Sequence, residues 1–218
     1  MIRAAIAVAA LMVASCGQIE RPRYGGDQER ALAQAALAGD TAAVDRLLAA
    51  HANPNVMVDV NGRSQSPWYI ALDQLRPGQA ATVTIIAAML KAGADPNAAW
   101  GTGDAAVTRQ ARSRWEQFWN GSRTQSTTTR NPMDVVMRHP VTDAVRLLVA
   151  AKFDRRLGEN ALVDAIESGN VEIAHILVDA GVNVNCRPGA LTPLVAAVEA
   201  RNLPLVTYLE DHEAREKP

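Results

Sequence analysis

One pattern occurs three times in the chain, and this repetition restricts the possible fold more than any other feature. Each copy is an aliphatic run at helical spacing that ends in a short turn rich in asparagine and aspartate. The three copies lie at 38–55, 85–97 and 168–185. A short helix of this kind has an apolar face that it cannot bury alone, so neighbouring copies must stack. The pattern predicts an all-α array of repeated units.

Two more segments follow the pattern less closely, at 131–149 and 191–209. The spacing supports a repeat, because Leu162 and Leu194 lie 32 positions apart and Met133 and Leu162 lie 29 positions apart. Abundant alanine, leucine and valine, with only 4% aromatic residues, favour closely packed helices over a β-sandwich. We count units at about 28–58, 62–98, 128–154, 158–186 and 190–213.

Residue types at the unit borders predict where the helices begin and end. A proline is tolerated at the first helical position, and the residue before it can cap the helix. The predicted pairs are Ser66-Pro67, Asn131-Pro132 and Thr192-Pro193. A residue in the left-handed conformation ends the second helix of a unit, usually a glycine. Gly93 and Gly181 take this place, and His51 replaces the glycine in the first unit.

These segments resemble the ankyrin repeat, whose second helix ends in a glycine and a turn like Ala94-Asp95-Pro96-Asn97. The resemblance implies an ankyrin-repeat solenoid of about five helix-turn-helix units over residues 28–213, with a polar tail at 214–218. It also implies that hairpin tips and a helical face bind protein partners. The family's Thr-Pro-Leu-His motif is incomplete, so its Thr–His hydrogen-bond network is not expected. The nearest segments are Ser66-Pro67-Trp68-Tyr69 and Thr192-Pro193-Leu194-Val195.

The first sixteen residues are of a different kind. Met1-Ile2-Arg3 is a short positive start, and residues 4–13 form an apolar run without a charge. This run is too short to span a bilayer as a helix and has the length of a signal-peptide core. It ends in Val13-Ala14-Ser15-Cys16.

That ending resembles the bacterial lipobox, in which the cysteine receives diacylglycerol and the preceding peptide is removed. The resemblance implies a signal peptide at 1–15, a lipid anchor on Cys16 and a location on the periplasmic side of the envelope. Gly17 favours the outer membrane, since an aspartate there would favour retention in the inner one. Residues 16–27 are predicted to be a flexible tether. The alternatives are a plain secretory signal with an incidental cysteine, and a buried helix.

Two insertions interrupt the repeat, a short one at 74–80 and a longer one at about 98–130, which falls in the third unit. The longer insertion holds three of the four tryptophans and five arginines, and a helix from Asp104 to about Trp119 is expected in it. Tryptophan and arginine dominate the energetics of protein interfaces, so we predict partner contacts here and at the start of the second unit. The alternative is that the apolar stripe of this helix packs on the neighbouring repeat. The predicted contact residues are Trp68, Tyr69, Trp100, Arg109, Arg112, Arg114, Trp115 and Trp119.

Motifs for catalysis are absent from the sequence, which has no Gly-x-Ser-x-Gly elbow, phosphate-binding glycine loop or Cys-x-x-Cys. No enzymatic activity, cofactor, metal or small-molecule substrate is therefore expected. Glu172, His175 and Asp179 share a helical face that could touch a metal, but the solvated side of a helix is the favoured interpretation. Cys186 is expected to be a shielded free thiol, with an intermolecular disulfide as the alternative. The net charge of −1 gives no support to nucleic acid as a partner.

The sequence thus predicts a lipid-anchored module that binds a protein partner. Among lipid-anchored periplasmic ankyrin proteins, the resemblance suggests an immunity-type inhibitor of an antibacterial effector such as a phospholipase. The alternative function is an envelope scaffold or stress-tolerance factor with several partners.

Overall fold

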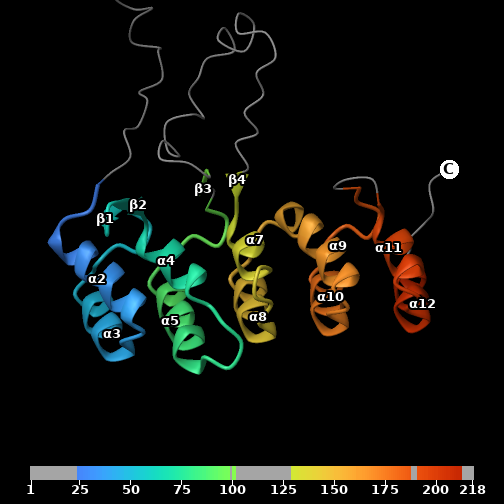
Figure 1. Ribbon diagram of the computed structural model, residues 1–218, viewed down its shortest axis with the longest axis horizontal. Coiled ribbons are helices and arrows are strands. Elements are labelled where there is room, and N and C mark those ends of the chain that lie inside the picture. The colour runs from blue at the N-terminus through green and yellow to red at the C-terminus, as the bar shows by residue number, and fades with distance from the viewer. Residues whose placement is uncertain (1–23, 99, 102–128, 188–190, 213–218) are drawn as a thin grey trace, which may run out of the picture.

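The computed structural model describes residues 24–98, 100–101, 129–187 and 191–212. Most of these residues belong to short helices that come in pairs, and the pairs stack side by side in a row (Figure 1). The predicted all-α repeat architecture is confirmed in this part of the chain. The pairs are α2 (Asp27–Ala38) with α3 (Thr41–Ala49), α4 (Pro67–Asp73) with α5 (Ala80–Lys91), α7 (Pro132–Val136) with α8 (Thr142–Ala150), α9 (Glu159–Glu167) with α10 (Val171–Asp179), and α11 (Pro193–Glu199) with α12 (Leu203–Asp211).

Three first helices begin at the predicted caps. The Ser66 hydroxyl accepts a hydrogen bond from the amide of Tyr69 at 3.1 Å, and the Asn131 side-chain oxygen accepts one from the amide of Asp134 at 3.1 Å. Thr192 does the same for α11 at 3.3 Å. A proline follows each cap at the first helical position. Each cap satisfies a backbone donor that the helix itself leaves without a partner.

Four second helices end at a residue in the left-handed region. The φ angles are 65° at His51, 93° at Gly93, 61° at Lys152 and 80° at Gly181. The three predicted positions are confirmed, and Lys152 is an addition. In each case the next amide bonds back to a carbonyl in the last turn of the helix, as from Ala94 to Met89 at 2.9 Å and from Val182 to Leu177 at 3.0 Å.

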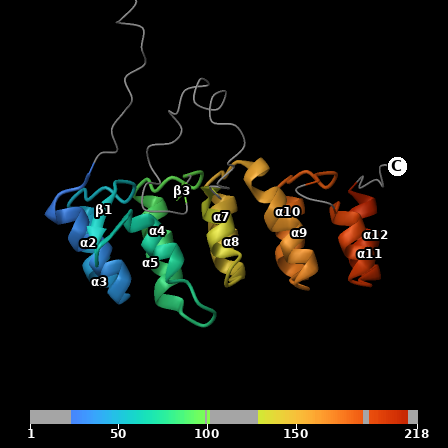
Figure 2. The same ribbon diagram turned by 45° about the horizontal axis from the view of Figure 1, so that its top comes forward.

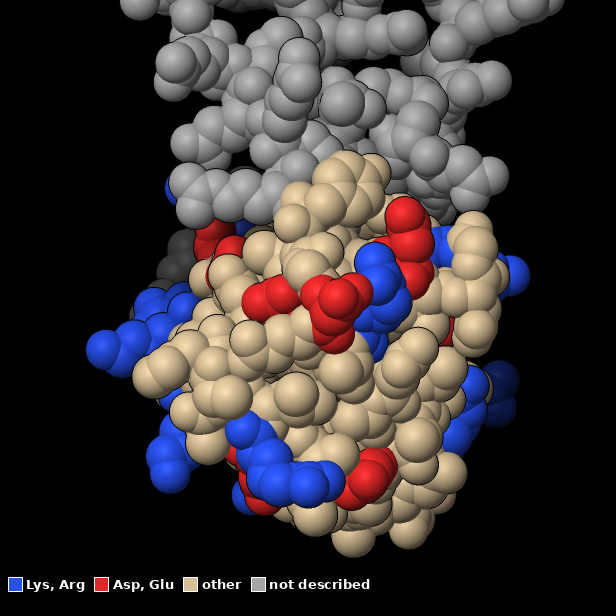
Figure 3. Space-filling model, turned by 90° about the vertical axis from the view of Figure 1, so that its left-hand side faces the viewer, with Lys and Arg blue, Asp and Glu red and all other residues tan. Residues whose placement is uncertain are grey.

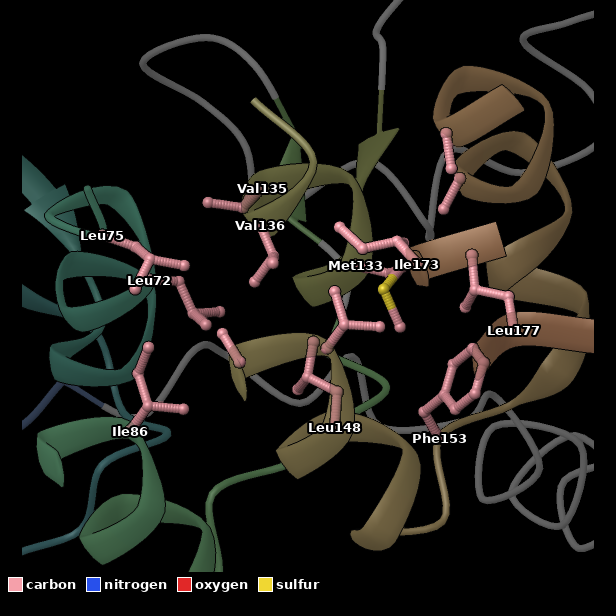
Figure 4. Packing of buried hydrophobic residues seen from close by; sticks show 14 of the residues in the cluster. Leu72, Leu75, Ile86, Met133, Val135, Val136, Leu148, Phe153, Ile173 and Leu177 are labelled. Atoms are coloured by element: carbon pink, nitrogen blue, oxygen red, sulfur yellow. The ribbon is translucent and has the colours of Figure 1, made fainter. Parts of the chain in front are cut away.

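A single apolar core runs along the stack and is built by neighbouring pairs together. Figure 4 shows side chains of three successive pairs meeting between the helices, among them Leu72, Met133 and Leu177. Each of these three side chains has at most 1% of its surface exposed. Burial of one such side chain contributes about 1.5–3 kcal/mol. The pairs therefore hold each other in place, as the repeat pattern requires.

Two short antiparallel strand pairs add to the helices. Strand β1 (Val58–Val60) pairs with β2 (Arg63–Gln65), a hairpin that the sequence analysis missed. Its signal was Asn61-Gly62, because both residues have a positive φ, as a two-residue hairpin turn requires. Strand β3 (Trp100–Gly101) pairs with β4 (Thr129–Arg130) and brings the two sides of the long insertion together. The helix expected from Asp104 lies outside the described residues.

The N-terminal border of the domain differs from the prediction. Tyr24 forms a parallel bridge with Met57, and the amide of Gly25 donates to the carbonyl of Met57 at 2.9 Å. Helix α2 then begins at Asp27. Residues 24–27 are thus part of the folded array, and the predicted tether at 16–27 extends too far. The missed contact joins segments more than thirty positions apart, which the local composition of the tether does not reveal.

The connections from each second helix to the next first helix all lie on one edge of the stack, together with β1–β4 (Figures 1 and 2). This turn edge consists of residues 50–66, 92–98, 100–101, 129–131, 151–158 and 180–187. The helices and their opposite connections form the helical body. Tyr24 joins the turn edge through Met57. None of the described helices is long and apolar enough to cross a membrane.

Candidate protein-binding surface

Asparagine side chains tie successive turns of the turn edge to one another. The Asn55 amide group donates to the carbonyl of Gly93 at 2.8 Å and accepts from the amide of Asp95 at 2.9 Å. One unit further along, the side-chain oxygen of Asn97 accepts from the amide of Asp154. The second asparagine of each of these turns, Asn55 or Asn97, therefore holds its turn on the next one. The bonds keep the backbone of the turn edge in one arrangement before any partner arrives.

The next turn breaks this pattern. Arg156 stands where the other turns carry the second asparagine, and its amide donates to the Asp154 side chain at 3.0 Å. The chain continues into the 3-10 helix η1 (Arg155–Gly158). The Arg155 guanidinium packs against Gly181, where an added Cβ would lie 3.2 Å from it. Both arginines are exposed, and the sequence analysis missed them although their departure from the asparagine pattern was the signal.

Charged side chains also lie on the first helices. Arg138, just after α7, forms an ion pair with Asp73 of α4 at 2.8 Å, so this bond joins two neighbouring pairs. Burial raises the pKa of Asp134, against the lowering effect of its hydrogen bonds with Asn131. Burial also raises the pKa of Asp164, and the charge of Asp134 raises it further. The carboxylates of α7 and α9 are therefore close enough to repel one another.

The predicted contact residue Trp68 is a core residue. Its side chain is 0% exposed, and its indole Nε1 donates to the carbonyl of Asp95 at 2.8 Å. A buried side chain cannot touch a partner while its unit stays folded, so Trp68 is removed from the contact surface. Trp68 is buried because the position after Pro67 lies on the apolar face of α4, which packs into the core. Its neighbour Tyr69 is partly exposed.

The other predicted residues are less completely placed. Trp100 lies in β3, on the turn edge, and its main chain alone is described. The remaining ones lie outside the described residues, as does the predicted lipidation site Cys16. These contact residues are Arg109, Arg112, Arg114, Trp115 and Trp119.

The side chains of the possible metal trio have separate partners. Glu172 forms an ion pair with Arg146 at 2.6 Å, whereas Asp179 accepts a hydrogen bond from the Tyr208 hydroxyl at 2.6 Å. The His175 ring packs on the Tyr208 ring, with centroids 4.1 Å apart. In the part of the chain that the structure describes, no three His, Cys, Asp or Glu side chains are grouped to hold a metal. The geometry supports the interpretation of this face as the solvated side of a helix.

Tyr208 and His212 join α12 to α10. The two rings lie 4.3 Å apart, and the His212 Nε2 atom lies 4.0 Å from the Asp179 carboxylate. Burial, the hydrogen bond to Asp179 and the charge of Asp179 together raise the pKa of Tyr208 to about 12. The cluster is a packing contact between the last two pairs.

Cys186 is a free cysteine with 3% of its surface exposed. Its thiol lies 3.8 Å from the carbonyl oxygen of Glu159. Burial, and secondarily the charge of Glu159, raises the pKa of the Cys186 thiol to about 11. The predicted shielding of this thiol is confirmed.

The two ends of the described array carry exposed apolar side chains. Figure 3 shows the end formed by α2 and α3, where charged side chains lie in separate groups with uncharged surface between them. Leu37 is exposed on α2. At the other end, Val198 of α11 and Leu203 of α12 are exposed, since no further described pair covers them. These residues are where stacking ends, and a terminal unit keeps one side uncovered.

Comparison with known families identifies the repeat. The ankyrin-repeat family matches residues 133–217, in three copies. The match begins within α7 and includes the helices from α8 to α12. No curated protein matches the chain. Residues 133–217 therefore match three ankyrin repeats, and such repeats indicate a protein–protein interaction module.

Proposed function

We propose that this chain is a lipid-anchored periplasmic protein that binds a protein partner, as an immunity-type inhibitor of an antibacterial effector such as a phospholipase. In this proposal the two N-terminal helix pairs are ankyrin-type units of the same solenoid. The observation that carries the proposal is the asparagine ladder, which runs from Asn55 through Asp95 and Asn97 to Asp154. This ladder extends the turn edge into the N-terminal helix pairs, which lie outside the residues 133–217 that match the ankyrin-repeat family. A rigid surface loses little freedom on binding and suits tight recognition.

The proposed anchor rests on the N-terminal sequence. Val13-Ala14-Ser15-Cys16 has the residues of a lipobox after an apolar run of signal-peptide length. The described chain begins at Tyr24, on the turn edge. A lipid on Cys16 would therefore hold this edge near the membrane, the surface at which a phospholipase acts.

We propose that the partner contacts are made from the same edge. Strands β3 and β4 attach both sides of residues 102–128 to the turn edge. Contacts made by Trp115 and Trp119 would then add to those of Trp100. Arginine and tryptophan are the residue types on which interface energy concentrates.

Protection of cells tests the inhibitor function. The full chain would be co-expressed with an effector encoded beside its gene and directed to the periplasm, and survival and effector activity would be measured. We expect protection, and its loss in the double variant Trp115→Ala with Trp119→Ala. The matched control replaces Val198 and Leu203, two exposed apolar residues at the end of the stack, by alanine.

Protection that survives loss of the tryptophans would contradict the predicted contact site. Capture of several unrelated envelope proteins without an effector would favour the scaffold function.

Mass spectrometry tests the anchor separately. The mature protein is expected to begin at Cys16 with an acylated cysteine, and a Cys16→Ser variant is expected to stay unmodified. A mature chain with an unmodified Cys16 would remove the membrane half of the proposal, and the binding half would stand.

A further inference from the structure

Charge is distributed unevenly between the turn edge and the helical body. Among the described residues, the turn edge carries six basic and three acidic side chains, whereas the helical body carries seven basic and fifteen acidic ones. The turn edge is therefore positive by three charges and the helical body negative by eight. The total charge of −1 for the whole chain conceals this polarity. The six basic side chains are Arg63, Arg130, Lys152, Arg155, Arg156 and Arg187.

Three exposed arginines of this set, Arg63, Arg155 and Arg156, come from two different turns. Arg63 begins β2, and Arg155 and Arg156 begin η1. None of the three forms an ion pair with another described residue. By contrast, Arg30, Arg138 and Arg146 of the helical body are each paired with a carboxylate. The charges of Arg63, Arg155 and Arg156 are thus available to an external anion, whereas three of the seven basic side chains of the helical body are neutralised by a carboxylate.

We propose that the turn edge docks on the anionic lipid headgroups of the membrane that holds the anchor. This inference rests on the proposed lipidation of Cys16, because the chain from Cys16 to Tyr24 is eight residues long and reaches at most about 28 Å. Tyr24 is fixed to the turn edge by its bridge with Met57. The tether therefore keeps this edge, and not the opposite one, closest to the bilayer.

The polarity of the molecule orients it in the same way. An anionic surface attracts the turn edge and repels the acidic helical body, so a single orientation is favoured. Screening limits this force to within about 8 Å at physiological salt, a distance that the tether allows the edge to reach. An acidic protein is the other possible occupant of the edge. The lipid surface is favoured because the attachment point and the free arginines lie on the same edge.

Docking in this orientation leaves the first helices accessible from the side. The face that carries the Asp73–Arg138 ion pair would then lie beside the docked edge and not against the headgroups. A partner that works on lipid could be bound there while its own substrate surface lies alongside.

Binding to lipid vesicles tests the docking surface without the anchor. The probe is the chain without residues 1–16, which lacks both the apolar run and the lipidation site, sedimented with vesicles of phosphatidylglycerol or of phosphatidylcholine. The edge variant replaces Arg63, Arg155 and Arg156 by glutamine. The matched control removes the same charge from the helical body by replacing Arg46, Arg76 and Lys91 by glutamine. Circular dichroism checks that each variant is folded.

We expect binding to phosphatidylglycerol alone, weakened as salt is raised. Each arginine near an anionic bilayer strengthens binding about fivefold, so the edge variant should lose roughly 100-fold and the control less than about fivefold. Equal binding to both lipids, or equal losses in the two variants, would overturn the proposal and assign the free arginines to a protein partner. Mass spectrometry of the wild-type chain reports separately whether Cys16 is lipidated, so failure of the anchor is distinguishable from failure of docking.

Discussion

The indole Nε1 of Trp68 donates a hydrogen bond to the main-chain carbonyl of Asp95 across 2.8 Å. Trp68 lies in the first turn of α4, and Asp95 lies in the turn after α5, so the bond joins the beginning of one helix pair to its end. The Asp95 carboxylate also accepts a hydrogen bond from the amide of Asn97, and the Asp95 amide donates one to the side-chain oxygen of Asn55. Core and turn edge are therefore linked at one residue.

Replacement of Trp68 is expected to destabilise the fold strongly. Trp68→Ala should lower the free energy of unfolding by about 3–5 kcal/mol, because it removes a fully buried ring. Trp68→Phe keeps much of the apolar volume but leaves the Asp95 carbonyl without its donor, at a cost of about 1–3 kcal/mol. Urea denaturation followed by circular dichroism measures both. The control is Leu37→Ala at an exposed site, and an equal effect of Leu37→Ala and Trp68→Ala would contradict the burial of Trp68.

Loss of a ladder asparagine is expected to loosen two units at once. Asn55→Ala removes one bond to the carbonyl of Gly93 and one from the amide of Asp95, and should cost about 1–2 kcal/mol. Hydrogen exchange of the Asp95 amide should become faster, since this amide loses its acceptor. Gln34→Ala, a polar change on the exposed side of α2, is the matched control and should leave the exchange unchanged. Unaltered protection of the Asp95 amide in Asn55→Ala would argue against the ladder.

Two adjacent glycines are expected to respond differently to alanine. A Cβ on Gly25 would lie 2.6 Å from the Glu29 Cβ and less than 3 Å from Val56 and Val58, so Gly25→Ala should cost about 1–3 kcal/mol. A Cβ on Gly26 would meet only the Glu29 carboxylate, at 3.6 Å, so Gly26→Ala should cost less than about 1 kcal/mol. Thermal or urea unfolding compares the two variants. Equal stabilities would mean that residues 24–26 do not pack on β1.

The Cys186 thiol is expected to react slowly in the folded protein. Its pKa of about 11 leaves little thiolate at pH 8, and its side chain is buried. Labelling of the Cys16→Ser chain with a disulfide reagent at pH 8 should be slow in buffer and fast in denaturant. The raised pKa also makes stability depend on pH. The free energy of unfolding falls as the pH rises from about 9, where the unfolded thiol loses its proton, towards 11, where the folded thiol loses it. Rapid labelling without denaturant would contradict this environment.

Tyr208 is expected to ionise at an unusually high pH in the folded protein. Its pKa of about 12 lies above the ordinary value of 10, so the folded state holds the proton after the unfolded state has released it. Its contribution to stability is complete below pH 10 and is lost as the pH rises towards 12. Phenolate absorbance should show a late step that is missing in Tyr208→Phe. In Asp179→Asn this step should shift to lower pH, and a step at unchanged pH would exclude Asp179 as a cause.

The candidate site was predicted only in part. The turn edge followed from the repeat, and β3 and β4 attach the long insertion to it. The exposed Arg155 and Arg156 were overlooked, since they stand at positions where the repeated turn has other residues. Trp68 was assigned to the surface because residue type alone does not say which side of α4 faces the core. Arg109, Trp115 and their neighbours stay predictions.

Most helix ends follow from local residue types alone. Caps such as Ser66 and Asn131, and turns such as that at Gly93, depend on bonds between residues three to five positions apart, which the local residue types specify. The folded arrangement was needed to establish that Trp68 is buried, that Tyr24 pairs with Met57 and that Arg63, Arg155 and Arg156 lie on one edge. These features depend on contacts or alignments between distant segments. Helical periodicity predicts which side chains share one face of a helix, but it does not predict which segment covers that face.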